Sequence, residues 1–252
     1  TEYVLIGGDV EIVPYRGVYA KVDSTADSNI PCDLYFSCLD GDWDADKDSI
    51  FGELTDNVDL MPEVYVGRAP VNTPDEAESF VKKVLIYHGL LNELLIGYKA
   101  DSTSDCADVK EEIATFTPSY YTVYKEYESE GGVDKQRVID YINEGVGIIN
   151  HAGHANYWTT PPFGGSWPDD GRPVVDSLTN KDLFIFYSLG CLPGKFEEAD
   201  CIGEHFVNNP NGGAVAFIGN SRYGWYARGN TKKYSGEYDI EFFKKFFVPV
   251  PP

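Results

Sequence analysis

The chain has 252 residues, enough for one large α/β domain or for two small lobes that share a sheet. Hydrophobic residues make up 42% of it, which is typical of a packed core. The formal net charge of −21 repels phosphate backbones and anionic membrane surfaces, so we expect no nucleic-acid partner. No apolar run approaches the roughly 20 residues of a membrane-spanning helix, so we expect no membrane insertion.

The first half of the chain alternates apolar and acidic segments. Residues 3–9 form an apolar run that ends in glycines, which predicts a buried strand followed by a loop. An acidic loop spans residues 40–59, and strand character resumes at 63–66. Thr73, Pro74 and Glu76 form a helix start with a capping box. The pattern predicts a helix to about Leu95, with one apolar face formed by Phe80, Val84, Tyr87 and Leu91.

The second half repeats a strand and helix alternation. A polar loop at 101–108 precedes a predicted helix at 109–116, a strand at 121–124 and a helix at 133–143. Apolar strands are predicted at 146–150, 183–188 and 213–218, with a Pro-rich and Gly-rich loop at 156–173. Helices are predicted at 199–207 and 240–247. The alternation predicts an α/β fold with a mostly parallel sheet flanked by helices.

Five cysteines are present: Cys32, Cys38, Cys106, Cys191 and Cys201. The odd number leaves at least one thiol unpaired. Cys32 and Cys38 are close enough in sequence to pair, but the spacing does not decide it. No CxxC, GxSxG, P-loop, HExxH or GxGxxG motif occurs, which argues against the zinc, serine hydrolase, NTPase and dehydrogenase classes.

One pair of residues points to nucleophilic chemistry. The strand at 146–150 leads to His154, and the strand at 183–188 leads to Cys191, 37 residues later. Carboxyl ends of parallel strands gather active-site residues, and a thiolate needs a nearby base. Glycines beside both residues let backbone N–H groups approach an oxyanion. A cysteine at a strand end is more often a small buried hydrophobic residue, so the pattern alone leaves both interpretations open.

Six segments resemble the gingipain-like cysteine peptidases, in the order of that family. Two carry the chemistry: Asn150-His-Ala-Gly-His154 and Cys191-Leu-Pro-Gly-Lys-Phe196. The others are residues 3–9 with 12–16, 40–46, 64–68 and 211–219. The chain departs from the family pattern in two places. Ala155 stands where the family usually has Gly, and Gly190 stands where it often has Ala.

The resemblance implies a caspase-like three-layer sandwich and a cysteine endopeptidase. Cys191 would be the nucleophile and His154 its base, with backbone N–H groups near Gly153 and at Cys191 holding the oxyanion. It also implies an acidic residue that orients the histidine, for which Asp101 is the first choice and Asp105 the second. Asp108 corresponds to the acid that binds Arg or Lys substrates in some members, and Trp225 to an aromatic residue over that pocket. The alternative for Asp101 and Asp105 is that both are solvated loop acids, and the alternative for Trp225 is a buried core tryptophan.

Three other histidines compete with His154. His151 lies three residues earlier and is expected to be structural. His205 and His88 fall in predicted helices, where packing or surface positions are more common than catalytic ones.

An acidic loop matches the calcium-binding template of an EF-hand. Its carboxylates are Asp42, Asp44, Asp46, Asp48 and Glu53, at positions 1, 3, 5, 7 and 12, and Lys47 replaces the usual glycine at position 6. We predict a structural calcium ion here, with Asp33 and Asp40 as further ligands, and no organic cofactor. A solvated acidic loop is the alternative.

The whole chain, 1–252, is expected to be one gingipain-like peptidase domain that lacks its N-terminal segment, with approximate lobes 1–96 and 97–247. Residues 248–252 would begin a linker. The expected partners are a protein or peptide substrate and other domains of the same precursor, and the expected location is extracellular or at the cell surface. An alternative function is a catalytically idle calcium-binding module of a cell-surface protein, and another is a self-processing peptidase.

Overall fold

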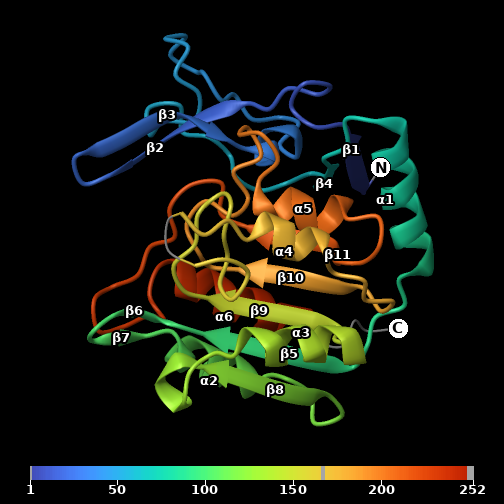
Figure 1. Ribbon diagram of the computed structural model, residues 1–252. Coiled ribbons are helices and arrows are strands. Elements are labelled where there is room, and N and C mark those ends of the chain that lie inside the picture. Colours follow the sequence, from blue (N-terminus) through green and yellow to red (C-terminus); the bar gives the residue numbers. More distant parts are fainter. Residues whose placement is uncertain (1, 166–167, 249–252) are drawn as a thin grey trace. The chain divides into compact units, whose positions relative to one another are not determined.

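A computed structural model describes residues 2–165 and 168–248 (Figure 1). The chain divides into two compact units, Thr1–Glu78 and Ser79–Pro252. The sequence placed the lobe boundary between residues 96 and 97. The division lies earlier because the strand at Asn92–Gly97 belongs to the sheet of the second unit. Apart from Val248, the expected linker start at 248–252 falls outside the described residues.

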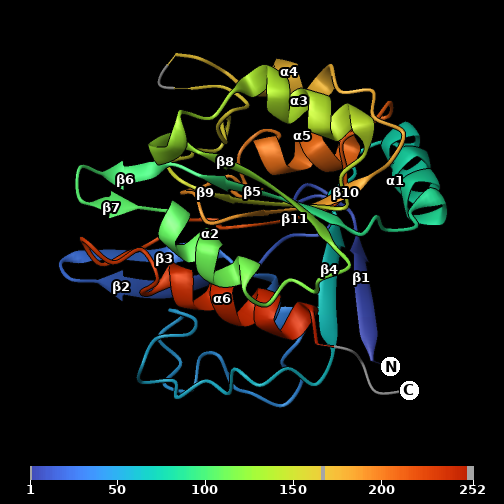
Figure 2. The same cartoon turned by 90° about the horizontal axis from the view of Figure 1, so that it is seen from below.

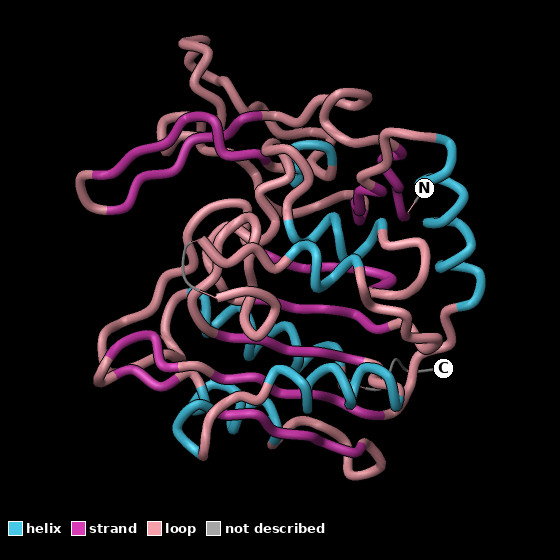
Figure 3. Tube along the Cα trace, viewed as in Figure 1, coloured by secondary structure: helices cyan, strands magenta, loops and turns pink. Residues whose placement is uncertain are grey.

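The first unit combines two small sheets with long loops (Figure 3). Strands β1 (Tyr3–Gly7) and β4 (Tyr65–Ala69) pair in parallel, and β2 (Gly17–Val22) and β3 (Thr25–Pro31) form an antiparallel hairpin followed by the short helix η1 (Asp33–Phe36). Arg68 on β4 ties this unit together. Its guanidinium donates to both carboxylate oxygens of Asp33 and to the carbonyl oxygens of Gly8 and Val13.

The second unit is built on a five-stranded parallel sheet in the order β11-β10-β9-β5-β8. Its strands are β5 (Asn92–Gly97), β8 (Thr122–Tyr127), β9 (Ile148–Ala152), β10 (Phe184–Ser188) and β11 (Ala214–Gly219). A small hairpin of β6 (Lys99–Asp101) and β7 (Ser104–Asp105) follows β5, and the short helix η2 (Glu128–Glu130) follows β8. Four of these strands were predicted, with ends that differ by at most three residues from those observed, whereas β5 had been predicted as the end of a helix.

Helices cover both faces of this sheet (Figure 2). On one face lie α3 (Lys135–Glu144), α4 (Arg172–Asp176) and α5 (Ile202–Asn208), and on the other lie α2 (Ala107–Ala114) and α6 (Ser235–Phe246). Neighbouring residues of β5 serve opposite faces: Leu94 and Ile96 pack in the core with α3 and α5, and Leu95 packs in the core with α2 and α6. The second unit therefore has three layers, because a strand buried on both faces alternates its side chains between two cores.

The helix expected from residue 73 to about Leu95 is too long. Helix α1 spans Pro74–Ile86, and Gly89 then adopts a positive φ of 63° before β5 begins. The predicted apolar face is also wrong in part, since Val84 and Leu91 are 49% and 57% exposed. The consecutive apolar residues 94–96 form a strand because pairing with β8 and β9 buries both of its faces, which no helical period reveals.

Candidate active site

His154 and Cys191 follow neighbouring strands at the same edge of the sheet. Ser188 of β10 pairs in register with His151 of β9, and each candidate residue lies three positions after its member of that pair. The predicted pairing of His154 with Cys191 depended on these strands being neighbours, and β9 and β10 are paired in the sheet. Parallel strands present their carboxyl ends at one edge, so the two loops emerge together.

Both residues line one pocket, a cavity of about 90 Å³ within the second unit. Four strands lead to it: β5 is followed by Ala100 and Cys106, β9 by His154, β10 by Cys191, and β11 by Trp225. Gly153 also lines it. The pocket therefore gathers a thiol, an imidazole and a flanking glycine, which is the set that acyl transfer through a cysteine requires.

The His154 ring is held by a backbone carbonyl group. Its Nε2 lies 2.9 Å from the carbonyl oxygen of Ala100. A carbonyl oxygen only accepts hydrogen bonds, so Nε2 carries the proton in the neutral ring and Nδ1 keeps its lone pair. This assigns Nδ1 as the nitrogen that can take up a proton.

Asp101, expected to orient His154, has other partners in the structure. One carboxylate oxygen accepts from the Thr103 backbone N–H and hydroxyl, and the other accepts from Ser104 and Tyr226 at 3.0 and 3.1 Å. These bonds, the Thr103 backbone N–H first, hold the pKa of Asp101 well below its usual range. The residue adjoins the Ala100 carbonyl, so its contacts fix the loop that bonds the histidine. Asp105, the second choice, accepts from the Ala107 backbone N–H.

The loop that contains Cys191 is held by hydrogen bonds to the loop that follows β11. The side-chain amide of Asn220 donates to the carbonyl oxygens of Leu189 and Gly190, and the Leu192 N–H donates to the Arg222 carbonyl oxygen. Leu192 has a φ of 69°, a conformation that a residue with a side chain rarely adopts. Burial raises the pKa of the Cys191 thiol, so the neutral thiol predominates, and its Sγ lies 3.8 Å from the Gly224 carbonyl oxygen.

The two departures from the family pattern occupy one space. A Cβ atom added to Gly190 would lie 2.3 Å from the Cβ of Ala155, far inside contact distance. The methyl group that the family often has before the cysteine is absent here because a methyl group after the histidine already fills that place. The close approach of the two loops is therefore kept by a complementary pair.

The other histidines are not among the residues that line the pocket. His151 is fully buried, and burial lowers the pKa of its ring to about 3, which keeps it neutral. Its Nδ1 lies 2.9 Å from the Ser188 hydroxyl and 3.1 Å from that of Thr160. His205 pairs with Asp176 on α4. His88 lies after the end of α1 and not within a helix.

The two predicted substrate-binding residues have different places. Trp225 lines the pocket and is 43% exposed, and it shares two hydrogen bonds with Ser235, so it is held there. Asp108 is exposed and is not among the lining residues, whereas Cys106 and Val109 on either side of it are.

In the first unit, three of the five predicted calcium ligands come together. Carboxylate oxygens of Asp44, Asp46 and Asp48 lie within 4.8 Å of one another. Asp42 and Glu53 are not in that group: Asp42 accepts from the Asp44 N–H, and Glu53 accepts from the Thr55 hydroxyl. Lys47 has a φ of 62°, so it adopts the left-handed conformation for which the template uses glycine.

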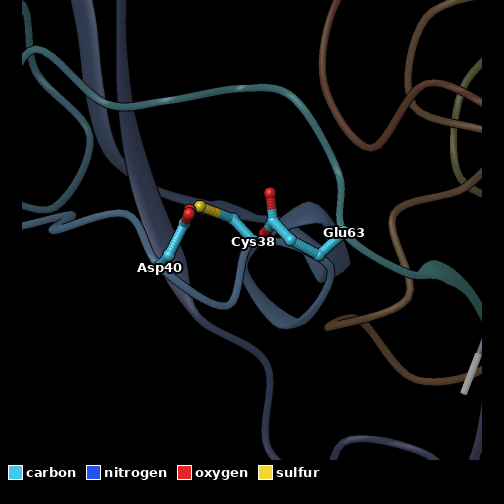
Figure 4. Close-up of side chains that lie close together, drawn as sticks. All are labelled: Cys38, Asp40 and Glu63. Carbon is cyan, nitrogen blue, oxygen red and sulfur yellow. The ribbon is translucent and has the colours of Figure 1, made fainter.

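Neither additional ligand joins this loop cluster. Asp33 is paired with Arg68, and Asp40 lies with Cys38 and Glu63 in a second group whose ligand atoms also lie within 4.8 Å of one another (Figure 4). In that group the Cys38 thiol donates to the Asp59 carbonyl oxygen, and Glu63 accepts from the Leu39 N–H. All five cysteines are unpaired, so Cys32 and Cys38 form no disulfide.

The chain is similar to known peptidases. The model of peptidase family C25 matches residues 1–249. The chain belongs to peptidase family C25. Lys-gingipain of Porphyromonas gingivalis is 27% identical in an alignment of 204 residues, which covers 75% of the chain and 10% of that protein. Gingipain R2 of the same species is 26% identical in an alignment of 168 residues, which covers 60% of the chain and 22% of that protein.

Solved structures of this family show the fold. The crystal structure of the Arg-specific cysteine proteinase gingipain R aligns with a TM-score of 0.66 and 21% identity, over 90% of the chain and 50% of that protein. The complex of the Porphyromonas gingivalis RgpB pro- and mature domains aligns with a TM-score of 0.70 and 20% identity, over 99% of the chain and 55% of that protein. The expected caspase-like α/β fold is thereby confirmed. The C25 chain spans about half the length of these structures, and a tenth to a quarter of the curated relatives.

The sequence missed three groups that build these sites in the C25 chain. Asn220 had a signal, because it follows a predicted strand at its carboxyl end. Asp56 is 5% exposed and accepts the N–H groups of Ala45, Gly52 and Glu53, which closes the base of the acidic loop. The Ala100 carbonyl group had no signal, because a backbone acceptor is independent of residue type.

Proposed function

We propose that the chain is a cysteine endopeptidase in which Cys191 attacks the scissile carbonyl carbon and His154 acts as base. The observation that supports this most is the shared pocket of the two residues, together with the Ala100 carbonyl that leaves Nδ1 of His154 unprotonated. The family's relatives include named cysteine proteinases.

The chemistry follows from the residue environments. Because the Cys191 pKa is raised by burial, the thiol is neutral at rest and gives its proton to His154 Nδ1 as the sulfur attacks. The imidazolium then protonates the leaving amine, and the N–H groups near Gly153 and at Cys191 would hold the oxyanion. Water activated by His154 hydrolyses the thioester and restores the thiol.

Two observations argue against the idle-module alternative and against a preference for Arg or Lys through Asp108. An idle module has no need for the ring orientation at His154 or for the pinned Cys191 loop. A basic preference through Asp108 would need that carboxylate in the pocket, and it is exposed outside the lining.

We also propose that the cluster of Asp44, Asp46 and Asp48 binds a structural calcium ion. Their oxygens fit the preference of calcium for carboxylates, and backbone carbonyl groups and water would complete the six to eight ligands. The ion would neutralise the loop and fix its conformation. A calcium requirement fits an extracellular or cell-surface location, where calcium is plentiful. Among the described residues no helix is long and apolar enough to cross a membrane.

A mixed peptide library tests the peptidase proposal. We expect the protein to cleave peptides, and Cys191→Ala and His154→Ala to lower kcat/KM by at least about 100-fold. Cys32→Ala and His88→Ala are matched controls, because they remove the same side chains from outside the pocket. Equal cleavage by Cys191→Ala and the unaltered protein would reject Cys191 as the nucleophile. No cleavage by the folded protein would favour the idle module.

A further inference from the structure

The pocket beside Cys191 is small, and the start of α2 forms part of its lining. Its cavity of about 90 Å³ is well below the roughly 300–1,000 Å³ of a site for a small-molecule ligand. Cys106 and Val109 line it and are 7% and 0% exposed. Gly236 of α6 also lines it, and a Cβ atom added there would lie 3.7 Å from Val109 Cγ2 and 2.1 Å from the Thr231 carbonyl oxygen. The small cavity favours a short side chain.

The pocket also carries no acidic side chain among its described lining residues. Residues three apart share one face of a helix, so Cys106 and Val109 face the pocket together while Asp108 between them does not. Burial raises the pKa of the Cys106 thiol to about 11, so this thiol is neutral and adds no negative charge.

Asp101, which directly follows the lining residue Ala100, already has a full set of hydrogen-bond donors. Its two oxygens receive four donors: the N–H and hydroxyl of Thr103, the hydroxyl of Ser104 and the hydroxyl of Tyr226. A carboxylate offers about four acceptor positions, so none is left for a substrate cation.

The hydroxyl groups of the wall are engaged as well. Thr231 donates to the Asp105 carbonyl oxygen, and Ser235 accepts from the Trp225 N–H. An Arg side chain brings five N–H donors and a Lys side chain three, all charged, and their burial without a charged partner is unfavourable. The acidic surface attracts basic peptides from a distance, but solvent and salt screen it beyond about 8 Å, and it supplies no acceptor inside the pocket.

We propose that this pocket selects a small uncharged side chain, such as that of Ala, Ser or Val, on the acyl side of the cleaved bond, with Val109 and Cys106 as specificity-determining residues. The acyl-side residue is the one whose carbonyl carbon Cys191 attacks. The assignment rests on the proposed peptidase function, and it gives the chain a substrate class different from those that the names Lys-gingipain and Arg-specific gingipain R describe.

Synthetic peptides that differ only in the acyl-side residue test it on the full chain. We expect kcat/KM for Ala, Ser and Val to exceed that for Arg and Lys by at least about 100-fold. Val109→Ala enlarges the pocket and should raise kcat/KM for Leu relative to Ala by about tenfold. Val109→Asp, checked for folding by its thermal unfolding, should raise cleavage after Arg and Lys at the expense of Ala.

The outcomes separate this inference from the proposed function. Cleavage chiefly after Arg or Lys, abolished by Asp108→Asn, would overturn the inference and leave the peptidase function in place. An unchanged preference in Val109→Ala would remove Val109 as a specificity determinant even if Val109→Asp fails to fold. No cleavage of any peptide by the folded protein would overturn both.

Discussion

Ala155 and Gly190 show how one methyl group sets the distance between two loops. Only one of the two positions has space for a Cβ atom, since the second would lie 2.3 Å from the first. The pair thus behaves as a unit, and a single substitution tests less than an exchange of the two residues.

Gly190→Ala alone should destabilise the protein by about 1–3 kcal/mol through overpacking and lower kcat on peptides. Ala155→Gly alone should cost about 1 kcal/mol. The exchange Ala155→Gly with Gly190→Ala should recover most of both losses, because the methyl group returns to the same space. Gly7→Ala is the control, as nothing lies within 4 Å of that added Cβ. Additive losses in the double variant, measured by chemical unfolding and peptide hydrolysis, would contradict the contact.

At the scale of the elements, β5 carries an acidic residue where both faces are buried. Glu93 is fully buried, its Oε2 accepts from the Thr117 hydroxyl at 2.7 Å, and its Oε1 has no partner among the described atoms. Desolvation raises the pKa of this carboxyl group to about 7 from an ordinary 4.5. The burial of Glu93 in β5 therefore lowers the stability of the fold by an amount that depends on pH.

The sign of this dependence follows from proton uptake. Between about pH 4.5 and 7 the folded chain binds more protons at Glu93 than the unfolded chain, so Glu93 lowers stability as pH rises through that window. Glu93→Gln should stabilise the protein by up to about 3 kcal/mol at pH 8 and have little effect at pH 4. Urea unfolding at both pH values measures this, with the exposed Glu144→Gln as control. An equal effect at pH 4 and pH 8 would show that Glu93 titrates normally.

For the whole molecule, the division into two compact units predicts that the proposed calcium ion stabilises the unit that contains its loop. The proposed calcium loop lies in Thr1–Glu78, and the pocket lined by Cys191 and His154 lies in Ser79–Pro252. Chelation should therefore act first on unfolding of the first unit.

Calorimetry with calcium and with a chelator measures this effect. Calcium at 100 times its dissociation constant should stabilise the first unit by about 2.7 kcal/mol. Asp46→Asn should remove the dependence, and Asp23→Asn, the same charge change in the exposed hairpin turn of this unit, should keep it. Identical thermograms with and without the chelator would refute the calcium proposal.

The sequence by itself determined the α/β class, four of the five strands of the main sheet, and Cys191 and His154 as the pair to examine. These depend on local patterns, since short apolar runs bounded by loop residues favour buried strands. The fifth strand, β5, was predicted as the end of a helix, because a short apolar run fits either structure until its pairing partners are known. The tertiary structure alone decided the end of α1, the partner of His154, the complementarity of Ala155 with Gly190, and the outward direction of Asp108. Each of these depends on residues or backbone groups brought together from distant parts of the chain, and no local pattern carries that information.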